Sequence, residues 1–123
     1  MKPVDEAPPP RQFDVWWASL PAPAGRRPVL LLSRTSAYAY LGRVLVVEVT
    51  TTVRAIPQEV ALGKREGLPR PCVANLDALR TVPTACLTAR IGGLAARRHV
   101  EVKRALGQAL HWPELTGLGV DAR

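Results

Sequence analysis

The sequence lacks any hydrophobic run long enough to cross a membrane as a helix. Its longest aliphatic runs, residues 29–32 and 44–47, fall far short of the roughly 20 apolar residues that a spanning helix needs. Residues 1–6 contain no apolar core of a secretory signal peptide. We therefore expect a cytoplasmic location and no membrane partner.

Cysteine is scarce, which excludes a disulfide-built fold. Cys72 and Cys86 are far apart, form no C-x-x-C motif and have no histidine cluster nearby. Zinc sites and disulfide frameworks need closer and more numerous ligands. We expect two reduced thiols, no metal site and no cofactor.

Acidic residues are few compared with basic ones. The 123 residues include 17 Lys or Arg and 10 Asp or Glu, which gives a formal net charge of +7. A small basic domain often binds a polyanion or an acidic protein, although a solvated basic surface explains the charge equally well. The charge favours RNA or an acidic protein as partner without naming an activity.

The chain length fits one domain, and hydrophobic residues at 47% are sufficient for a core. Residues 1–12 hold four prolines and almost no large apolar side chain, which predicts a flexible arm. We expect residues 13–112 to form the folded domain and residues 113–123 a C-terminal tail.

Short apolar runs bounded by turn residues predict a mainly β fold. After Leu94, apolar residues recur at helical spacing until Pro113, so one amphipathic helix should close the core. The expected strands cover residues 13–20, 28–33 and 43–50, with weaker candidates at 55–62, 72–76, 79–82 and 87–91.

Aromatic residues are also few, at 5%. Trp16 and Trp17 are adjacent in a predicted strand and must point to opposite faces. We expect one in the core and the other at an interface with a partner protein or a base. Tyr38 and Tyr40 are further candidates for base stacking.

Three segments together resemble one family. They are the strand at residues 14–20, the Gly-x-Arg-Pro-Val element at 25–29, and the Val-Val-x-Val-Thr-Thr element at 46–51. In order and spacing they are similar to the MazF/PemK toxins, endoribonucleases of type II toxin–antitoxin systems. The resemblance implies an SH3-like barrel of the MazF/CcdB/PemK kind with a C-terminal helix, a homodimer, and a MazE-like antitoxin as partner.

The resemblance places the cleavage site at Arg27 and Thr50. RNA carries its own nucleophile, because its 2′-hydroxyl can attack the adjacent phosphorus and leave 2′,3′-cyclic phosphate and 5′-hydroxyl ends. The protein must hold the geometry and stabilise charge, which suits a guanidinium and a hydroxyl. Neither a metal nor a protein nucleophile is required. The candidate RNA-binding residues are Arg26, Ser33, Thr51, Thr52 and Arg54.

Proton transfer has no obvious carrier in the sequence. The pKa of arginine stays above about 12, so Arg27 suits electrostatic work better than base catalysis. His99 and His111 both fall in the predicted helix, and we expect His99 to be structural.

The chain departs from the family in two places. Its first loop has only Pro-Ala-Pro-Ala at residues 21–24, where relatives carry a longer Gly-Ser-Glu-Gln segment. Phe13 stands where glycine is common.

These observations predict a metal-independent, sequence-specific endoribonuclease acting on single-stranded RNA, either messenger or transfer RNA. One alternative is a CcdB-like gyrase poison, which uses a C-terminal aromatic residue such as Trp112. The other is a non-catalytic barrel that only binds RNA or protein.

Overall fold

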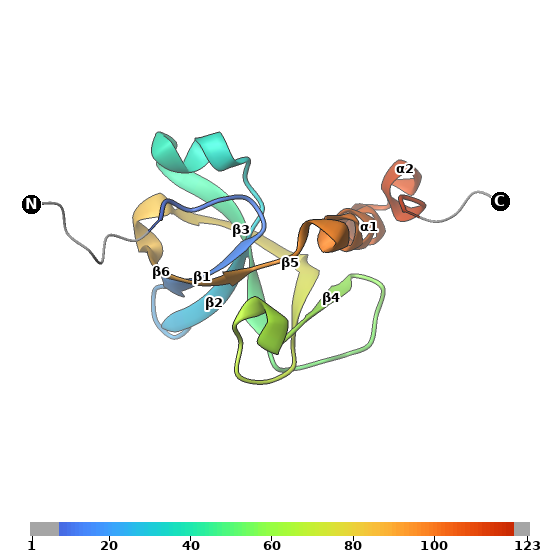
Figure 1. The fold of residues 1–123 in the computed structure, drawn as a ribbon, viewed down its shortest axis with the longest axis horizontal. Helices are drawn as coiled ribbons and strands as arrows, with labels where there is room; N and C mark the ends of the chain where they lie inside the picture. The colour runs from blue at the N-terminus through green and yellow to red at the C-terminus, as the bar shows by residue number, and fades with distance from the viewer. Residues whose placement is uncertain (1–7, 120–123) are drawn as a thin grey trace, which may run out of the picture.

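The computed structural model, which describes residues 8–119, contains a curled antiparallel sheet in the strand order β4-β5-β3-β2-β1-β6 (Figure 1). The strands are β1 Asp14–Ser19, β2 Arg26–Leu31, β3 Arg43–Thr50, β4 Glu59–Leu62, β5 Cys72–Pro83 and β6 Leu87–Gly93. Two α-helices follow, α1 His99–Leu110 and α2 Pro113–Thr116. Four short 3-10 helices lie in the connecting segments: η1 Thr35–Ala39, η2 Lys64–Glu66, η3 Thr84–Cys86 and η4 Ala96–Arg98.

Both faces of the sheet are covered, which explains the continuous apolar runs in the central strands. On one face, Leu30 and Val47 pack with Val102 of α1. On the other face, Val29 and Val46 pack in a second cluster that includes residues of η1. Figure 1 shows α1 beside β4 and β5. The expected mainly β barrel with a C-terminal helix is confirmed.

The two edges of the sheet come together where η2, directly after β4, meets β6. Gly67 has a φ of +90°, and a side chain there would collide with the carbonyl of Ile91. A Cβ on Gly92 would collide with the carbonyl oxygen of Glu66. Glycine at both positions therefore permits the backbone approach that closes the curled sheet.

This closure makes Gly92→Ala destabilising. The added methyl must displace the backbone of η2, and overpacking of this kind costs about 1–3 kcal/mol. Thermal unfolding should show a Tm several degrees below that of the unmodified chain. Gly42→Ala is the matched control, because nothing lies within 4 Å of a Cβ at Gly42. Equal Tm values for the two variants would contradict the closure argument.

Several predicted boundaries need correction. β2 begins at Arg26, earlier than residue 28, because Arg26 and Arg27 pair with Ser19 and Ala18 of β1. The two predicted strands at 72–76 and 79–82 are one strand, β5, which pairs with β4 and then with β3. The predicted strands at 13–20, 43–50 and 87–91 are confirmed as β1, β3 and β6.

The C-terminal helix begins later than predicted, at His99, because the chain from Leu94 first forms η4. It ends at Leu110, and His111 adopts a left-handed φ of 56°. Pro113 then starts α2. Gly107 lies so close to Leu115 that a side chain on it would clash, so α2 packs tightly on α1.

Phe13 adopts a left-handed backbone conformation with a φ of +72°. A left-handed conformation costs a non-glycine residue about 1–2 kcal/mol. The Phe13 ring stacks on His99 with centroids 3.8 Å apart, and its backbone bonds Leu31 and Leu94. These contacts hold the strained residue in place. Residues 1–7 of the predicted arm lie outside the described residues, while Gln12 donates a hydrogen bond to the carbonyl of Leu32.

Cys72 and Cys86 are free thiols, as predicted. Burial raises the pKa of the Cys72 thiol, which disfavours its reactive thiolate form. Between residues 8 and 119, no helix has the length and apolar character needed to traverse a bilayer.

Candidate functional site

A groove of about 460 Å³ opens where β2 begins and β3 ends, and part of β5 forms its other wall. The structure brings four of the predicted site residues into this groove, namely Arg27, Thr50, Thr52 and Arg54. The remaining lining residues are Glu48, Asn75, Asp77 and Ala78.

The pairing of β2 with β3 explains why Arg27 and Thr50 meet. The strands are antiparallel, with Val29 opposite Glu48. Side chains alternate between the faces of a strand, so Arg27 shares a face with Val29, and Thr50 shares it with Glu48. The buried cluster continues along this face and gives way to polar side chains at the end of the sheet.

Arg27 is held by its inner nitrogen and open at its tip. Its Nε donates to the carbonyl oxygen of Ala24 at 3.1 Å and lies 3.9 Å from Oε1 of Glu48. Within residues 8–119, the terminal Nη atoms make no hydrogen bond to protein, and the side chain is 46% exposed. The paired N–H groups are therefore available to phosphate oxygens.

Thr50 and Arg54 are fixed by short backbone contacts. The hydroxyl oxygen of Thr50 accepts a hydrogen bond from the Thr52 N–H at 3.1 Å, which leaves its own O–H free to donate. The carboxylate of Glu59 accepts from the backbone N–H groups of Arg54 and Ala55 at 3.0 and 2.9 Å. Glu59 thereby holds the turn that carries Arg54.

Glu48 lies between Arg27 of β2, which lines the groove, and Arg80 of β5, which does not. Its Oε2 accepts a hydrogen bond from Nη1 of Arg80 at 2.7 Å. Its other oxygen faces Arg27, and the side chain is 29% exposed. Sequence reasoning overlooked Glu48, although its position two residues before Thr50 places it on the same strand face.

Three predicted site residues do not line the groove. Arg26 lies on the opposite face of β2, where its guanidinium is 4.0 Å from the centroid of the Trp17 ring. Ser33 accepts a hydrogen bond from the Leu45 N–H at 2.8 Å, a contact that ties the end of β2 to β3. Thr51 is exposed but outside the groove.

The aromatic residues differ in how far they are buried and in what covers them. Trp16 is in the core, as expected of one tryptophan of the pair, and its Nε1 donates to Asp14. Arg26 covers one face of Trp17, the tryptophan predicted to lie at an interface with a partner protein or a base. Tyr38 is buried, and this burial raises the pKa of its hydroxyl, so it is not a stacking platform. Tyr40 is 66% exposed.

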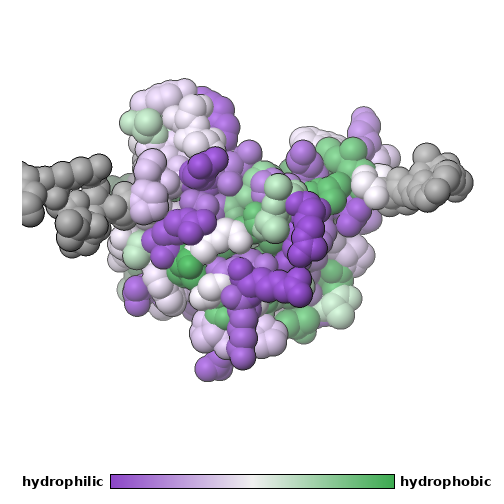
Figure 2. Space-filling view, viewed as in Figure 1, coloured by the Kyte–Doolittle hydropathy of each residue, from purple (hydrophilic) through white to green (hydrophobic). Residues whose placement is uncertain are grey.

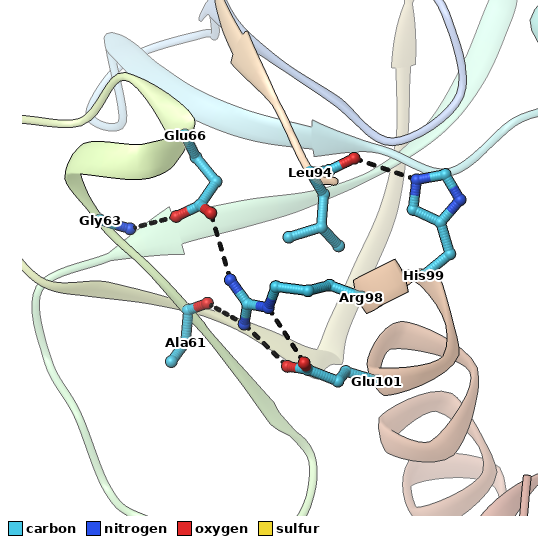
Figure 3. Close-up of polar contacts among 7 residues, drawn as sticks. All are labelled: Ala61, Gly63, Glu66, Leu94, Arg98, His99 and Glu101. Carbon is cyan, nitrogen blue, oxygen red and sulfur yellow. Dashed lines mark hydrogen bonds and ion pairs between the residues drawn. The ribbon is translucent and has the colours of Figure 1, made fainter. Parts of the chain in front are cut away.

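A second hollow, of about 440 Å³, lies at the junction of β1, β6 and α1 and contains several arginines. Two of them, Arg98 (Figure 3) and Arg90, form structural ion pairs. Arg98 pairs with Glu101 at 2.7 Å and with the buried Glu66 at 3.1 Å, and it also donates to the carbonyl of Ala61. Arg90 pairs with the buried Asp14. Both buried carboxylates in this hollow are therefore neutralised.

His99 belongs to this structural end of the molecule. Its Nε2 donates to the carbonyl of Leu94 at 3.0 Å, and its ring stacks on Phe13 (Figure 3). His99 does not line the groove that contains Arg27. The expectation that His99 is structural is confirmed by these contacts.

The Arg98–Glu101 pair predicts an acid-dependent loss of stability. Hydrogen bonds from Arg98 lower the pKa of Glu101 below its ordinary value of 4.5. A lowered carboxyl pKa stabilises the fold above 4.5, and this contribution is lost as pH falls through the lowered value. The Tm of Glu101→Gln should lie below that of the unmodified chain at neutral pH, and the difference should shrink as the pH falls below 4.5 and through the lowered pKa of Glu101.

Thermal unfolding across this pH range measures the effect. Glu114→Gln, at an exposed position of α2, controls for the loss of one negative charge. A Tm difference for Glu101→Gln that is independent of pH would contradict the assignment.

In the part of the chain from residue 8 to 119, no group of three or more His, Cys, Asp or Glu side chains is arranged to hold a metal ion. Asn75 and Asp77 also escaped sequence reasoning. They reach the groove because the pairing of β5 with β3 is irregular at this point, and no local sequence pattern predicts that irregularity.

The matching family model covers residues 11–110 and is described as the PemK-like, MazF-like toxin of type II toxin–antitoxin systems. The probable endoribonuclease MazF5 of Mycobacterium tuberculosis is 40% identical over 102 residues, which cover 82% of this chain and 93% of that protein.

Solved structures agree with the family match. The Mycobacterium tuberculosis toxin MazF-mt6 has a TM-score of 0.75 and 34% identity, covering 80% of this chain and 96% of its own. An endoribonuclease from a mycobacterial species, solved in complex with its cognate antitoxin, has a TM-score of 0.73 and 27% identity, covering 85% and 97%.

The curled six-stranded sheet with a C-terminal helix is the fold of a class of small β-barrel toxins. This chain belongs to the PemK/MazF family of type II toxin–antitoxin systems. The family, the fold and the enzyme class predicted from the sequence, an endoribonuclease, are thereby confirmed.

Proposed function

We propose that the groove binds single-stranded RNA, of messenger or transfer type, and cleaves it by attack of a 2′-hydroxyl on the adjacent phosphorus. The products are a 2′,3′-cyclic phosphate and a 5′-hydroxyl end. The observation that supports this most strongly is the convergence of Arg27, Thr50 and Arg54 on one open groove. The reaction is cytoplasmic, where such RNA is found.

Arg27 and Thr50 supply electrostatic stabilisation. The free Nη groups of Arg27 match the non-bridging phosphate oxygens, on which negative charge grows in the transition state. The Thr50 hydroxyl adds one hydrogen bond from the neighbouring strand. Because both side chains are held by backbone contacts, little reorganisation is needed when the substrate binds.

Thr52 and Arg54 extend the groove along the RNA backbone. Their place in the lining favours contact with a flanking phosphate. Binding that relies on such cations weakens as salt rises, because the counterions displaced from the RNA gain less entropy when the bulk ion concentration is already high.

Replacing Arg27 should remove cleavage and keep the fold. Loss of one preorganised donor to a developing oxyanion costs at least about 10²-fold in rate. The test incubates a long single-stranded RNA with Arg27→Ala or the unmodified chain, in excess EDTA, and maps the ends. Discrete cuts with cyclic phosphate and 5′-hydroxyl ends should appear only with the unmodified chain.

Arg70→Ala is the matched control, because Arg70 is exposed and outside the groove lining. It should cut at the rate of the unmodified chain. The proposal fails if the unmodified chain leaves several unrelated RNAs intact, or if Arg27→Ala cuts at the full rate.

A MazE-like antitoxin is the proposed regulator. Mycobacterial and Deinococcus radiodurans relatives were solved as toxin–antitoxin complexes. The net charge of +7 favours an acidic segment of the antitoxin that folds along the groove and covers Arg27.

The proposed assembly is a homodimer that uses the apolar surface between β3 and α1. Leu45, Leu110 and Trp112 are exposed, and Leu45 lines a small apolar hollow of about 170 Å³ together with Leu106 of α1. Figure 2 shows apolar residues at the surface beside α1 and α2. Large apolar side chains exposed on one side of the molecule favour an interface there.

Leu45→Glu should give a monomer, because a carboxylate cannot be buried without a partner. Sedimentation at a concentration where the unmodified chain is dimeric measures this. Ala61→Glu places the same charge at an exposed position of β4 and should leave the dimer intact. If Leu45→Glu is still dimeric, the interface does not include the surface around Leu45.

A further inference from the structure

Glu48 is an unexpected group in a groove that binds a polyanion. It projects from β3 between the buried Val47 and Val49, two residues before Thr50. A carboxylate here opposes phosphate binding, since like charges repel across a few ångströms. A carboxylate at this position therefore needs a function that compensates for its repulsion of the phosphate.

The two oxygens of Glu48 have different surroundings. Arg80 holds Oε2 by a hydrogen bond of 2.7 Å. Oε1 is 3.9 Å from the Arg27 Nε, beyond hydrogen-bond distance, and it accepts no hydrogen bond from residues 8–119. One oxygen is therefore anchored, while the other is open beside the arginine proposed to bind the scissile phosphate.

The proposed cleavage needs a proton acceptor near that phosphate. Arg27 remains protonated at any working pH. His99 is occupied with Leu94 and Phe13 outside the groove. Asp77 is the other carboxylate of the lining, but within residues 8–119 it forms no ion pair with Arg27 or Arg80.

We propose that Glu48 is the general base of the reaction and that Arg80 is its positioning residue. The inference rests on the proposed function, because it needs the 2′-hydroxyl as nucleophile. A 2′-hydroxyl and its phosphate are only a few bonds apart, so one nucleotide can contact Oε1 of Glu48 and the tip of Arg27 together.

The step balances without any co-reactant except water. The 2′-oxygen gives its proton to Oε1 of Glu48 and forms a bond to phosphorus. The bond from phosphorus to the 5′-oxygen breaks, and that oxygen keeps the electron pair and takes a proton from water. Glu48 then returns its proton to the solvent.

The charged groups around Glu48 are Arg27 on β2, Arg80 and Asp77 on β5, and Arg54 after β3. The arginines keep their charge throughout the working range. A decline of the cleavage rate at acid pH therefore reports protonation of Glu48 or of Asp77, and the two corresponding amide variants distinguish them.

The test compares Glu48→Gln with the unmodified chain. The amide keeps an oxygen for Arg80 but cannot act as a base, so kcat should fall by about 10²–10⁴-fold. Affinity for an RNA with a single 2′-deoxy nucleotide at the cleavage site should be equal or tighter, because a negative charge is gone. Glu48→Ala should recover activity when formate is added, and Glu114→Gln should keep the full rate.

Other outcomes would overturn the assignment. A Glu48→Gln variant that cuts within a few-fold of the unmodified rate, with cyclic phosphate ends still formed, removes Glu48 and leaves the proposed function intact. If the decline of the cleavage rate at acid pH disappears in Asp77→Asn but persists in the residual activity of Glu48→Gln, Asp77 is the general base. Weaker binding by Glu48→Gln, with no formate rescue of Glu48→Ala, makes Glu48 structural. If the unmodified chain leaves 5′-phosphate ends, the 2′-hydroxyl mechanism and the base fall together.

Discussion

The register between β2 and β3 is the constraint on which the groove depends. With Val29 opposite Glu48, Arg27 and Thr50 reach the same end of the same sheet face. A slip of one residue would turn either strand over and point its polar groups into the opposite core. Burial on both faces prevents such a slip, because Val29 and Leu30 face different cores and both are fully buried. Apolar packing thus positions the groups of the groove.

Much of this arrangement could be predicted from the sequence. The mostly apolar run at residues 43–50 lies between Gly42 and the polar pair Thr51 and Thr52, so both bounds of β3 were predictable. The start of β2 was not, since Pro28 suggested a loop before it. The ladder to β3 begins only at Val29, and the earlier residues pair with β1, so the proline is tolerated there. That pairing sends Arg26 and Arg27 to opposite faces.

The far wall of the groove illustrates what a sequence pattern cannot show. β3 and β5 pair at Val47 with Leu79 and again at Val49 with Ala74, so residues 75–78 have too few partners opposite them. This irregularity carries Asn75 and Asp77 into the groove. It is a property of two strands paired together, and neither strand alone encodes it. Glu48 differs, because strand alternation from Thr50 was enough to place it.

The basic charge of the chain serves two purposes that composition cannot separate. At the junction of β1, β6 and α1, Arg90 and Arg98 neutralise the buried carboxylates of Asp14 and Glu66. Arg98, which directly precedes α1, also ties the start of that helix to β4 through the carbonyl of Ala61 (Figure 3). In the groove, the tip of Arg27 has no such partner among the described residues. A guanidinium already bound to a buried carboxylate has little left to offer a phosphate, whereas an open one keeps its donors for the substrate. A structural arginine in this protein is therefore one whose guanidinium is paired with a buried carboxylate, and a candidate functional arginine is one whose terminal N–H groups are open.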